Sequence, residues 1–102
     1  MITFESYQDG AKSTAGNAEL AVLALGLAGE AGEVADMVKK ILGHDQILNV
    51  NKLALELGDV LWYLSMLCTH LNIDLGEVAY MNLLKLKARH PEGFDSSYHD
   101  RV

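Results

Sequence analysis

Proline occurs once in this chain, at Pro91, so nothing in the first 90 residues forbids a helix outright. These residues are rich in alanine, leucine, methionine, glutamate and lysine, which are good helix formers. The sequence shows no sustained alternation of apolar and polar residues and few β-branched residues, so it does not favour strands. It therefore predicts an all-α fold, and a length of 102 residues favours a single domain over 1–102.

Capping residues divide the chain into four predicted helices, of which the first two lie in its N-terminal half. The first spans about 4–12, with Thr3 as its N-cap. The second spans about 17–42, with Asn17 as its N-cap and Gly43 as its C-terminal stop.

The third and fourth predicted helices span about 50–71 and 74–90. Asp74 and Glu77 form an acidic variant of the capping box at the start of the fourth helix, and the proline of the chain ends it. The polar tail 92–102 is expected to be loosely ordered.

The second and third predicted helices are apolar around much of their circumference. Such coverage suits helices that are buried on several sides, in a bundle or at a subunit interface. Hydrophobic residues make up 50% of the chain, although a solitary domain of this size buries only about two-thirds of its unfolded surface. We therefore expect a dimer or tetramer.

The charge, the hydropathy and the cysteine content disfavour several classes of partner and bear on the location of the protein. Eight Lys and Arg against fourteen Asp and Glu give a net charge of −6, which disfavours nucleic acid and anionic membranes as partners. No apolar run is long enough to span a bilayer, and the N-terminus lacks the pattern of a secretory signal. The single cysteine, Cys68, cannot form an internal disulfide, which fits a cytoplasmic location.

Two pairs of carboxylates interrupt the apolar helices. Glu30 and Glu33 lie three residues apart in one helix, and Glu56 and Asp59 lie three residues apart in the next. Each pair shares one helix face, where like charges repel. If the helices fold back antiparallel about a connection near 44–45, Glu30 faces Asp59 and Glu33 faces Glu56. The small residues within the pairs, among them Gly32 and Gly58, are expected to allow close helix approach.

Four carboxylates at one level of a bundle must be neutralised, and a divalent cation does this. An all-oxygen ligand set without histidine or cysteine favours Mg²⁺, or Mn²⁺, over zinc. The alternative interpretation is that these are ordinary solvated helix charges.

Three segments carry a family resemblance: GLAGEAGEV at 26–34, ELGDVLWY at 56–63 and KLKARHPEGF at 85–94. They resemble the MazG-like nucleotide pyrophosphohydrolases of the all-α nucleoside triphosphate pyrophosphohydrolase superfamily, and the resemblance covers roughly 17–94. It implies a four-helix-bundle-like MazG fold completed by oligomerisation, as a homodimer or a dimer of dimers. It also implies Mg²⁺-dependent cleavage between the α- and β-phosphates of a nucleoside triphosphate, giving the monophosphate and pyrophosphate.

The chain departs from the family pattern at Gly29. Several relatives carry a glutamate at this place, just before the first motif glutamate, and it is a proposed water-activating residue. The general base therefore stays open between the four motif carboxylates and a water held by the metal.

Further candidate residues extend the site toward the substrate. Asn82, Lys85 and Arg89 share one face of the fourth helix and supply donors for a triphosphate. Lys40 lies seven residues after Glu33 on the same face, in reach of phosphate, and Tyr63 lies four residues past Asp59 and is a candidate to stack on a base or hold a sugar. For all five, a solvated or packing role is the alternative, and core packing is favoured for Trp62.

Two other functions compete with this assignment. A ferritin-like di-metal bundle would need Glu-x-x-His pairs, and no histidine lies three residues after a glutamate in this chain. A non-catalytic helical oligomerisation module that retains the fold stays as the main alternative.

Overall fold

A computed structural model describes residues 1–43 and 49–93, and in this part of the chain it contains four α-helices and no strand. The helices are α1 (Phe4–Lys12), α2 (Leu20–Gly43), α3 (Val50–His70) and α4 (Leu75–Arg89). The all-α prediction is confirmed. The expected connection near 44–45 and the tail beyond 93 lie outside the described residues.

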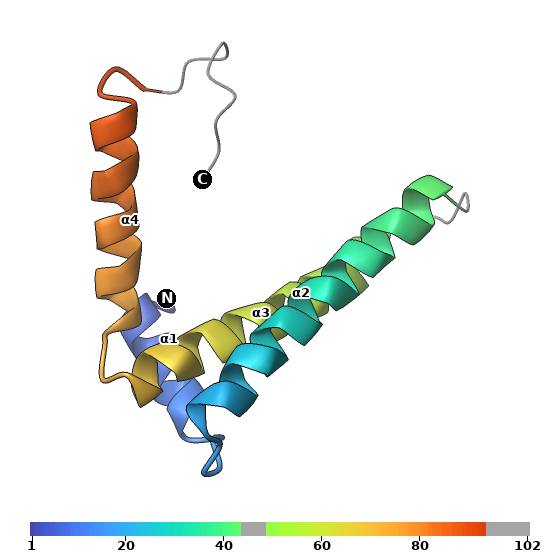
Figure 1. Cartoon of the computed structure of the whole chain (residues 1–102), viewed down its shortest axis with the longest axis horizontal. Helices are drawn as coiled ribbons and strands as arrows, with labels where there is room; N and C mark the ends of the chain where they lie inside the picture. The colour runs from blue at the N-terminus through green and yellow to red at the C-terminus, as the bar shows by residue number, and fades with distance from the viewer. Residues whose placement is uncertain (44–48, 94–102) are drawn as a thin grey trace.

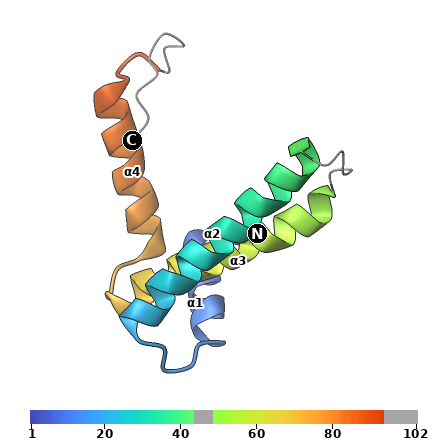
Figure 2. The ribbon, with the colours of Figure 1, turned by 45° about the vertical axis from the view of Figure 1, so that its right-hand side comes forward.

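Helices α2 and α3 run antiparallel and side by side as a long arm (Figures 1 and 2). Helix α1 crosses the base of this arm, where it contacts α3. Helix α4 leaves from the same base and stands away from the arm; among the described residues it contacts α1 and α3 but not α2. The predicted hairpin is confirmed, but the four helices do not close into a bundle within one chain.

The core is small and lies at the base of the arm. Ala11, Leu23 and Met66 form a buried cluster that joins α1, α2 and α3. Trp62 packs against this cluster and donates a hydrogen bond of 3.0 Å from its indole nitrogen to the Thr14 hydroxyl oxygen. The predicted packing role of Trp62 is therefore confirmed.

The start of α1 agrees with its prediction, but the start of α2 does not. Thr3 caps α1 in a reciprocal capping box with Ser6. Helix α2 begins at Leu20, so Asn17 does not cap it. The hydroxyls of Ser13 and Thr14 bond back to carbonyl oxygens of α1, and Thr14 also accepts the Trp62 bond. These bonds tie Ser13 and Thr14 to α1 and Thr14 to α3, and the chain continues without helix to Leu20, three residues later than the capping pattern predicts.

The capping box predicted for α4 is also wrong. Asp74 occupies the N-cap position, but its side chain makes no capping hydrogen bond. The backbone amide of Leu75 instead donates to the side-chain oxygen of Gln8, at 2.8 Å. The first turn of α4 is thus capped by a residue of α1.

The packing of α2 against α3 explains why one position of the arm is glycine. A Cβ added at Gly26 would overlap the Tyr63 ring, so this position must stay glycine for α2 and α3 to approach. A Cβ at Gly32 or Gly58 would meet nothing within 4 Å in the described structure. The expectation that these two glycines serve close helix approach is therefore wrong within the chain.

The described chain leaves much apolar surface exposed. Five apolar side chains are buried in it: Ala11, Leu23, Met66, Cys68 and Leu75. The radius of gyration is 16.2 Å, whereas a compact domain of this size has about 13 Å. None of the described helices is long and apolar enough to cross a membrane.

The contact between Gly26 and Tyr63 can be tested by substitution. We expect Gly26→Ala to lower the thermal midpoint, because overpacking costs about 1–3 kcal/mol and exceeds the gain of roughly 0.5–1 kcal/mol from replacing a helical glycine. Gly10→Ala in α1 is the control, since its added Cβ meets no atom within 4 Å, and it should raise the midpoint. Thermal unfolding followed by circular dichroism measures both, and equal shifts would contradict the packing role of Gly26.

Candidate metal centre

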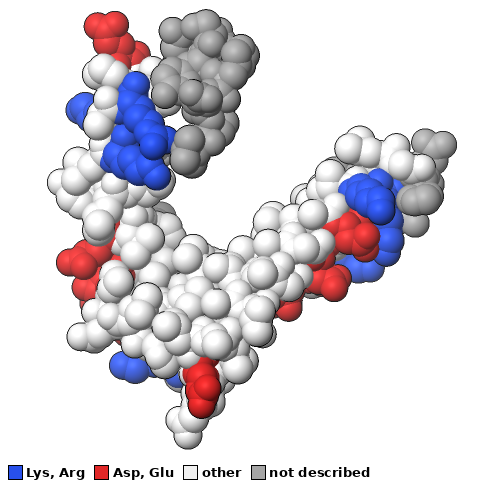
Figure 3. All heavy atoms as spheres, in the orientation of Figure 1, with Lys and Arg blue, Asp and Glu red and all other residues white. Residues whose placement is uncertain are grey.

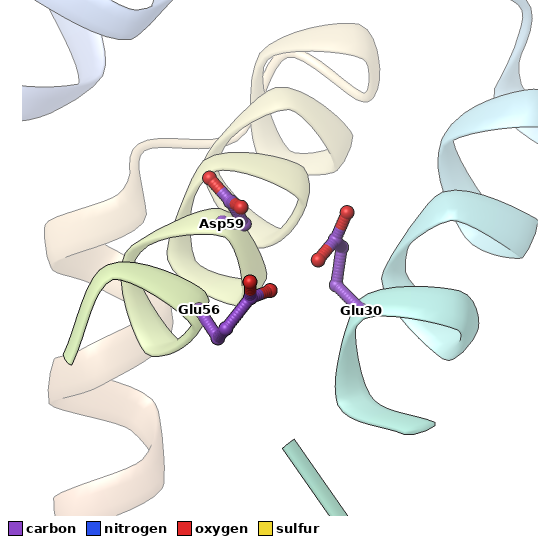
Figure 4. Close-up of side chains that lie close together, drawn as sticks. All are labelled: Glu30, Glu56 and Asp59. Carbon is purple, nitrogen blue, oxygen red and sulfur yellow. The ribbon is translucent and has the colours of Figure 1, made fainter. Parts of the chain in front are cut away.

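Three carboxylates converge in the middle of the arm. Glu30 projects from α2, Glu56 and Asp59 project from α3, and the three point toward one another (Figure 4). One oxygen of each lies within 4.8 Å of one oxygen of the others. The i, i+3 spacing puts Glu56 and Asp59 on one face of α3, and the antiparallel pairing of the helices brings Glu30 opposite them.

Crowding of these acids changes the protonation of Glu30. Partial burial raises the pKa of Glu30, and the nearby charges of Asp59 and Glu56, a side-chain hydrogen bond with Glu56 and the charge of Glu33 raise it further. In the described part of the chain, no lysine, arginine or histidine forms an ion pair with the three clustered acids. Their mutual repulsion is therefore not relieved by a cationic side chain.

The cluster fits a hard divalent cation. Mg²⁺ binds oxygen at about 2.0–2.1 Å, so oxygens on opposite sides of it lie about 4.2 Å apart, and those of Ca²⁺ lie farther apart. Separations of up to 4.8 Å need only small side-chain rotations to reach the Mg²⁺ value. The donor set is carboxylate oxygen throughout, which is the ligand type that Mg²⁺ and Mn²⁺ prefer.

Glu33 and Lys40 lie farther along α2. The Glu33 side chain is exposed and lies outside the three-carboxylate cluster, although its charge still acts on Glu30. Lys40 forms an ion pair of 3.0 Å with Asp36, one turn earlier on the same helix. The hydrogen bond to Asp36, and then its charge, raise the pKa of Lys40.

Two tyrosines lie on the side of the cluster nearer the base. The Tyr63 ring packs against Gly26 and meets the ring of Trp62 edge-on, with centroids 5.0 Å apart. Burial, and then the charge of Asp59, raise the pKa of the Tyr7 phenol, which places α1 within electrostatic reach of the acids. Tyr7 was not predicted as a site neighbour, because no spacing rule connects it to residues of another helix.

The predicted residues of α4 are not brought to the cluster within one chain. Asn82, Lys85 and Arg89 are exposed on a helix that does not contact α2. Lys and Arg gather on the distal half of α4, and on the arm across the open V acidic side chains lie beside a second group of cationic side chains near its tip (Figure 3).

A cavity of about 520 Å³ opens at the base of the arm, and it was not predicted. Leu23, Trp62 and Met66 form its apolar wall. Its polar lining comes from α1, from the segment before α2 and from the end of α3: Lys12, Asn17, Glu19, Thr69 and His70. Only Glu19 has a sequence signal, because it lies eleven residues before Glu30, about three helical turns along the same face. That spacing allows a lining role for Glu19, although an acid favoured by the helix dipole is the preferred interpretation from sequence.

The raised pKa of Glu30 predicts a pH-dependent effect on stability without metal. A folded-state pKa above the ordinary value of 4.5 means that stability is lost as the pH rises through it. With chelator present, we expect Glu30→Gln to raise the thermal midpoint at about pH 7 and to leave it nearly unchanged at about pH 3, where Glu30 is protonated in both states.

Glu92→Gln is the matched control, because it removes the same charge beyond the end of α4. It should leave the midpoint nearly unchanged at both pH values. A midpoint for Glu30→Gln below that of the wild type at neutral pH would contradict repulsion within the cluster.

Comparison with known proteins places these residues in a family. The chain matches the MazG nucleotide pyrophosphohydrolase domain over residues 19–94. It is 44% identical over 78 residues to the Gene 37 protein of Mycobacterium phage L5, a match that covers 72% of this chain and 68% of the phage protein. No solved structure matches it. The matched region includes α2, α3, α4 and all three clustered acids, and the chain belongs to the MazG nucleotide pyrophosphohydrolase family.

Proposed function

We propose that this protein is a Mg²⁺-dependent nucleoside triphosphate pyrophosphohydrolase that cleaves between the α- and β-phosphates, giving a nucleoside monophosphate and pyrophosphate. The observation that carries the proposal is the convergence of Glu30, Glu56 and Asp59 in a chain of this family. Mn²⁺ has the same ligand preference and is expected to substitute.

In this proposal the three clustered acids hold the metal, and Glu33 completes the set by a rotation of its exposed side chain. A bound divalent cation supplies charge neutralisation on the phosphate oxygens. Because position 29 is glycine, the same carboxylates are also the proposed groups that orient the attacking water.

Asn82, Lys85 and Arg89 are proposed to bind the phosphates, and we call them the phosphate-binding face of α4. A chain of net charge −6 needs such a local group of donors to attract a polyanion. Lys40 and Tyr63 remain proposed substrate contacts. Tyr63 lies one helical turn beyond Asp59, and its ring meets that of Trp62, which lines the cavity.

The cavity at the base of the arm is the proposed place for the nucleoside. Asp59, Trp62 and Met66 follow the i, i+3, i+7 spacing, so one face of α3 leads from the acids to the cavity wall. An apolar wall with a few polar groups is typical of small-molecule sites. The preferred base is not assigned.

We propose a homodimer or homotetramer as the active form, located in the cytoplasm, as the lone reduced cysteine Cys68 favours. Helix α4 is apolar and exposed over most of its length, and in one chain it stands apart from the acids that it would serve. We propose that a second copy of the chain covers the exposed face of α4 and brings that helix close to the acids of its partner.

The function is tested by incubating the protein with Mg²⁺ and a panel of nucleoside and deoxynucleoside triphosphates and identifying the products. We expect a monophosphate and pyrophosphate, and loss of this turnover with chelator. Asp59→Asn should reduce turnover by about 10²-fold or more, because it removes a charged metal ligand.

Glu5→Gln on α1 is the control for a change of charge away from the cluster, and it should retain turnover. Orthophosphate and a diphosphate as products would mean attack at the γ-phosphorus and would overturn the proposed chemistry. A folded wild-type protein without turnover on the whole panel would favour the alternative, a non-catalytic oligomerisation module.

The oligomeric state is tested by sedimentation. The chain mass is 11.1 kDa, and we expect about 22 kDa or about 44 kDa at micromolar concentration, because the exposed apolar faces need a partner. A measured mass equal to that of one chain would contradict this prediction.

A further inference from the structure

The side chain of Gln8 ties α1 to the junction between α3 and α4. Its amide oxygen accepts a hydrogen bond of 2.8 Å from the backbone amide of Leu75, the first residue of α4. Its amide nitrogen donates to the carbonyl oxygen of Ile73 at 2.9 Å and to the hydroxyl oxygen of Thr69 at 3.2 Å. The Thr69 hydroxyl in turn donates to the carbonyl oxygen of Ser65, so its oxygen can accept from Gln8.

This set of bonds specifies glutamine. The side chain at position 8 must offer one oxygen that accepts from a backbone amide and one N–H group that donates to two oxygens. Glutamate has the acceptor but no donor, and methionine, of similar length, lacks the donor and is a weak acceptor. The N-cap residue of α4, Asp74, makes no side-chain capping bond of its own. Gln8 therefore supplies the cap that the local sequence does not.

Little else in the described chain fixes the direction of α4. Leu75 is 3% exposed and anchors the first turn, but Tyr80, Met81 and Leu83 are each more than 60% exposed. Helix α4 contacts α1 and α3 and does not contact α2. Within one chain, the angle between α4 and the base of the arm is consequently set in its first turns, where Gln8 binds and where Val78 and Ala79 are half-buried.

A small change at this turn is amplified along the helix. Lys85 lies ten residues beyond Leu75, which is about 15 Å along an α-helix. A tilt of about 10° at the first turn would move Lys85 by roughly 3 Å over this length, whereas hydrogen-bond distances vary by only about 0.5 Å.

We propose that Gln8 is a positioning residue that sets the angle of α4 and thereby places the phosphate-binding face of Asn82, Lys85 and Arg89, a role that rests on the function proposed above. Gln8 does not touch the substrate in this scheme. It acts through the cap of α4, so its loss should weaken the binding of phosphates and leave the binding of metal by the clustered acids intact.

The test uses inorganic tripolyphosphate with Mg²⁺, because this probe carries the phosphates without a base. Calorimetry on the full chain should show that Gln8→Met, which keeps the length of the side chain and removes its polar atoms, weakens tripolyphosphate binding by about five-fold or more. The affinity for Mg²⁺ alone should stay within about two-fold of that of the wild type. Gln8→Glu keeps the acceptor for Leu75 and loses the donor, so its effect should be intermediate.

Ser6→Ala is the matched control. It removes the hydrogen bond between the Thr3 amide and the Ser6 hydroxyl at the start of α1, and no bond of Ser6 reaches α4. It therefore loosens the helix that carries Gln8 and leaves the three hydrogen bonds of the Gln8 side chain, which we call the Gln8 clamp, in place. We expect tripolyphosphate binding within about two-fold of that of the wild type.

A double-mutant cycle shows whether Gln8 acts through the phosphate-binding face of α4. If it does, the effect of Gln8→Met should shrink to less than about two-fold in a Lys85→Ala background, because the two changes remove the same contact. Hydrogen exchange of the Leu75 amide should accelerate in Gln8→Met and stay unchanged in Ser6→Ala. This measurement checks the clamp independently of any ligand.

The positioning role is overturned by unchanged tripolyphosphate binding in Gln8→Met, by an equal loss in Ser6→Ala, or by an undiminished effect in the Lys85→Ala background. It is also overturned if the wild type does not bind the probe. Failure of the proposed function has a different signature. In that case the wild type would release no pyrophosphate from any nucleotide, while the Gln8 effects on tripolyphosphate binding and Leu75 exchange would still appear.

Discussion

Repulsion among Glu30, Glu56 and Asp59 is the constraint on which the arrangement of the arm depends. Two helices that carry these acids on facing sides would separate if nothing else joined them. Contacts nearer the base oppose this separation: Tyr63 packs against Gly26, and Trp62 joins the buried cluster of α1, α2 and α3 and binds Thr14. The acids are therefore held close together by packing one to several helical turns away, and bringing their like charges together costs free energy that a bound cation would offset.

The separation between the packed base and the acidic arm also explains why the core is small. Apolar contacts concentrate at the base, where three helices meet, and the arm beyond it consists of two helices with exposed outer faces. A two-helix arm cannot bury the apolar residues that surround α2, and α4 offers an apolar surface that meets no partner within the described chain. The proposed second subunit would both cover the exposed apolar surface and bring an α4 helix to the acids.

The sequence was sufficient where a feature depends on local or periodic signals. The limits of α1 follow from Thr3 and the helix formers after it, and the pairing of Glu30 with Glu56 and Asp59 follows from i, i+3 spacing and one antiparallel hairpin. It was insufficient where a side chain from another helix decides the outcome. Trp62 binds Thr14 in the segment before α2, and the cap of α4 comes from Gln8 rather than Asp74. Neither partner can be identified from spacing, since 48 and 67 residues separate the bonded pairs.

Helix α3 contacts each of the other three helices, and this affects how the site must be studied. It supplies Glu56 and Asp59 to the acids, Trp62 and Met66 to the cavity, and Thr69 to the Gln8 clamp. A substitution in α3 can therefore alter the acid cluster, the cavity and the hydrogen bonds of Gln8 together. Glu30 and Gln8 lie on α2 and α1 and each enters only one of these three sets, so changes there separate the effects. Metal binding should respond to Glu30 and not to Gln8, and phosphate binding in the absence of a base should respond to both.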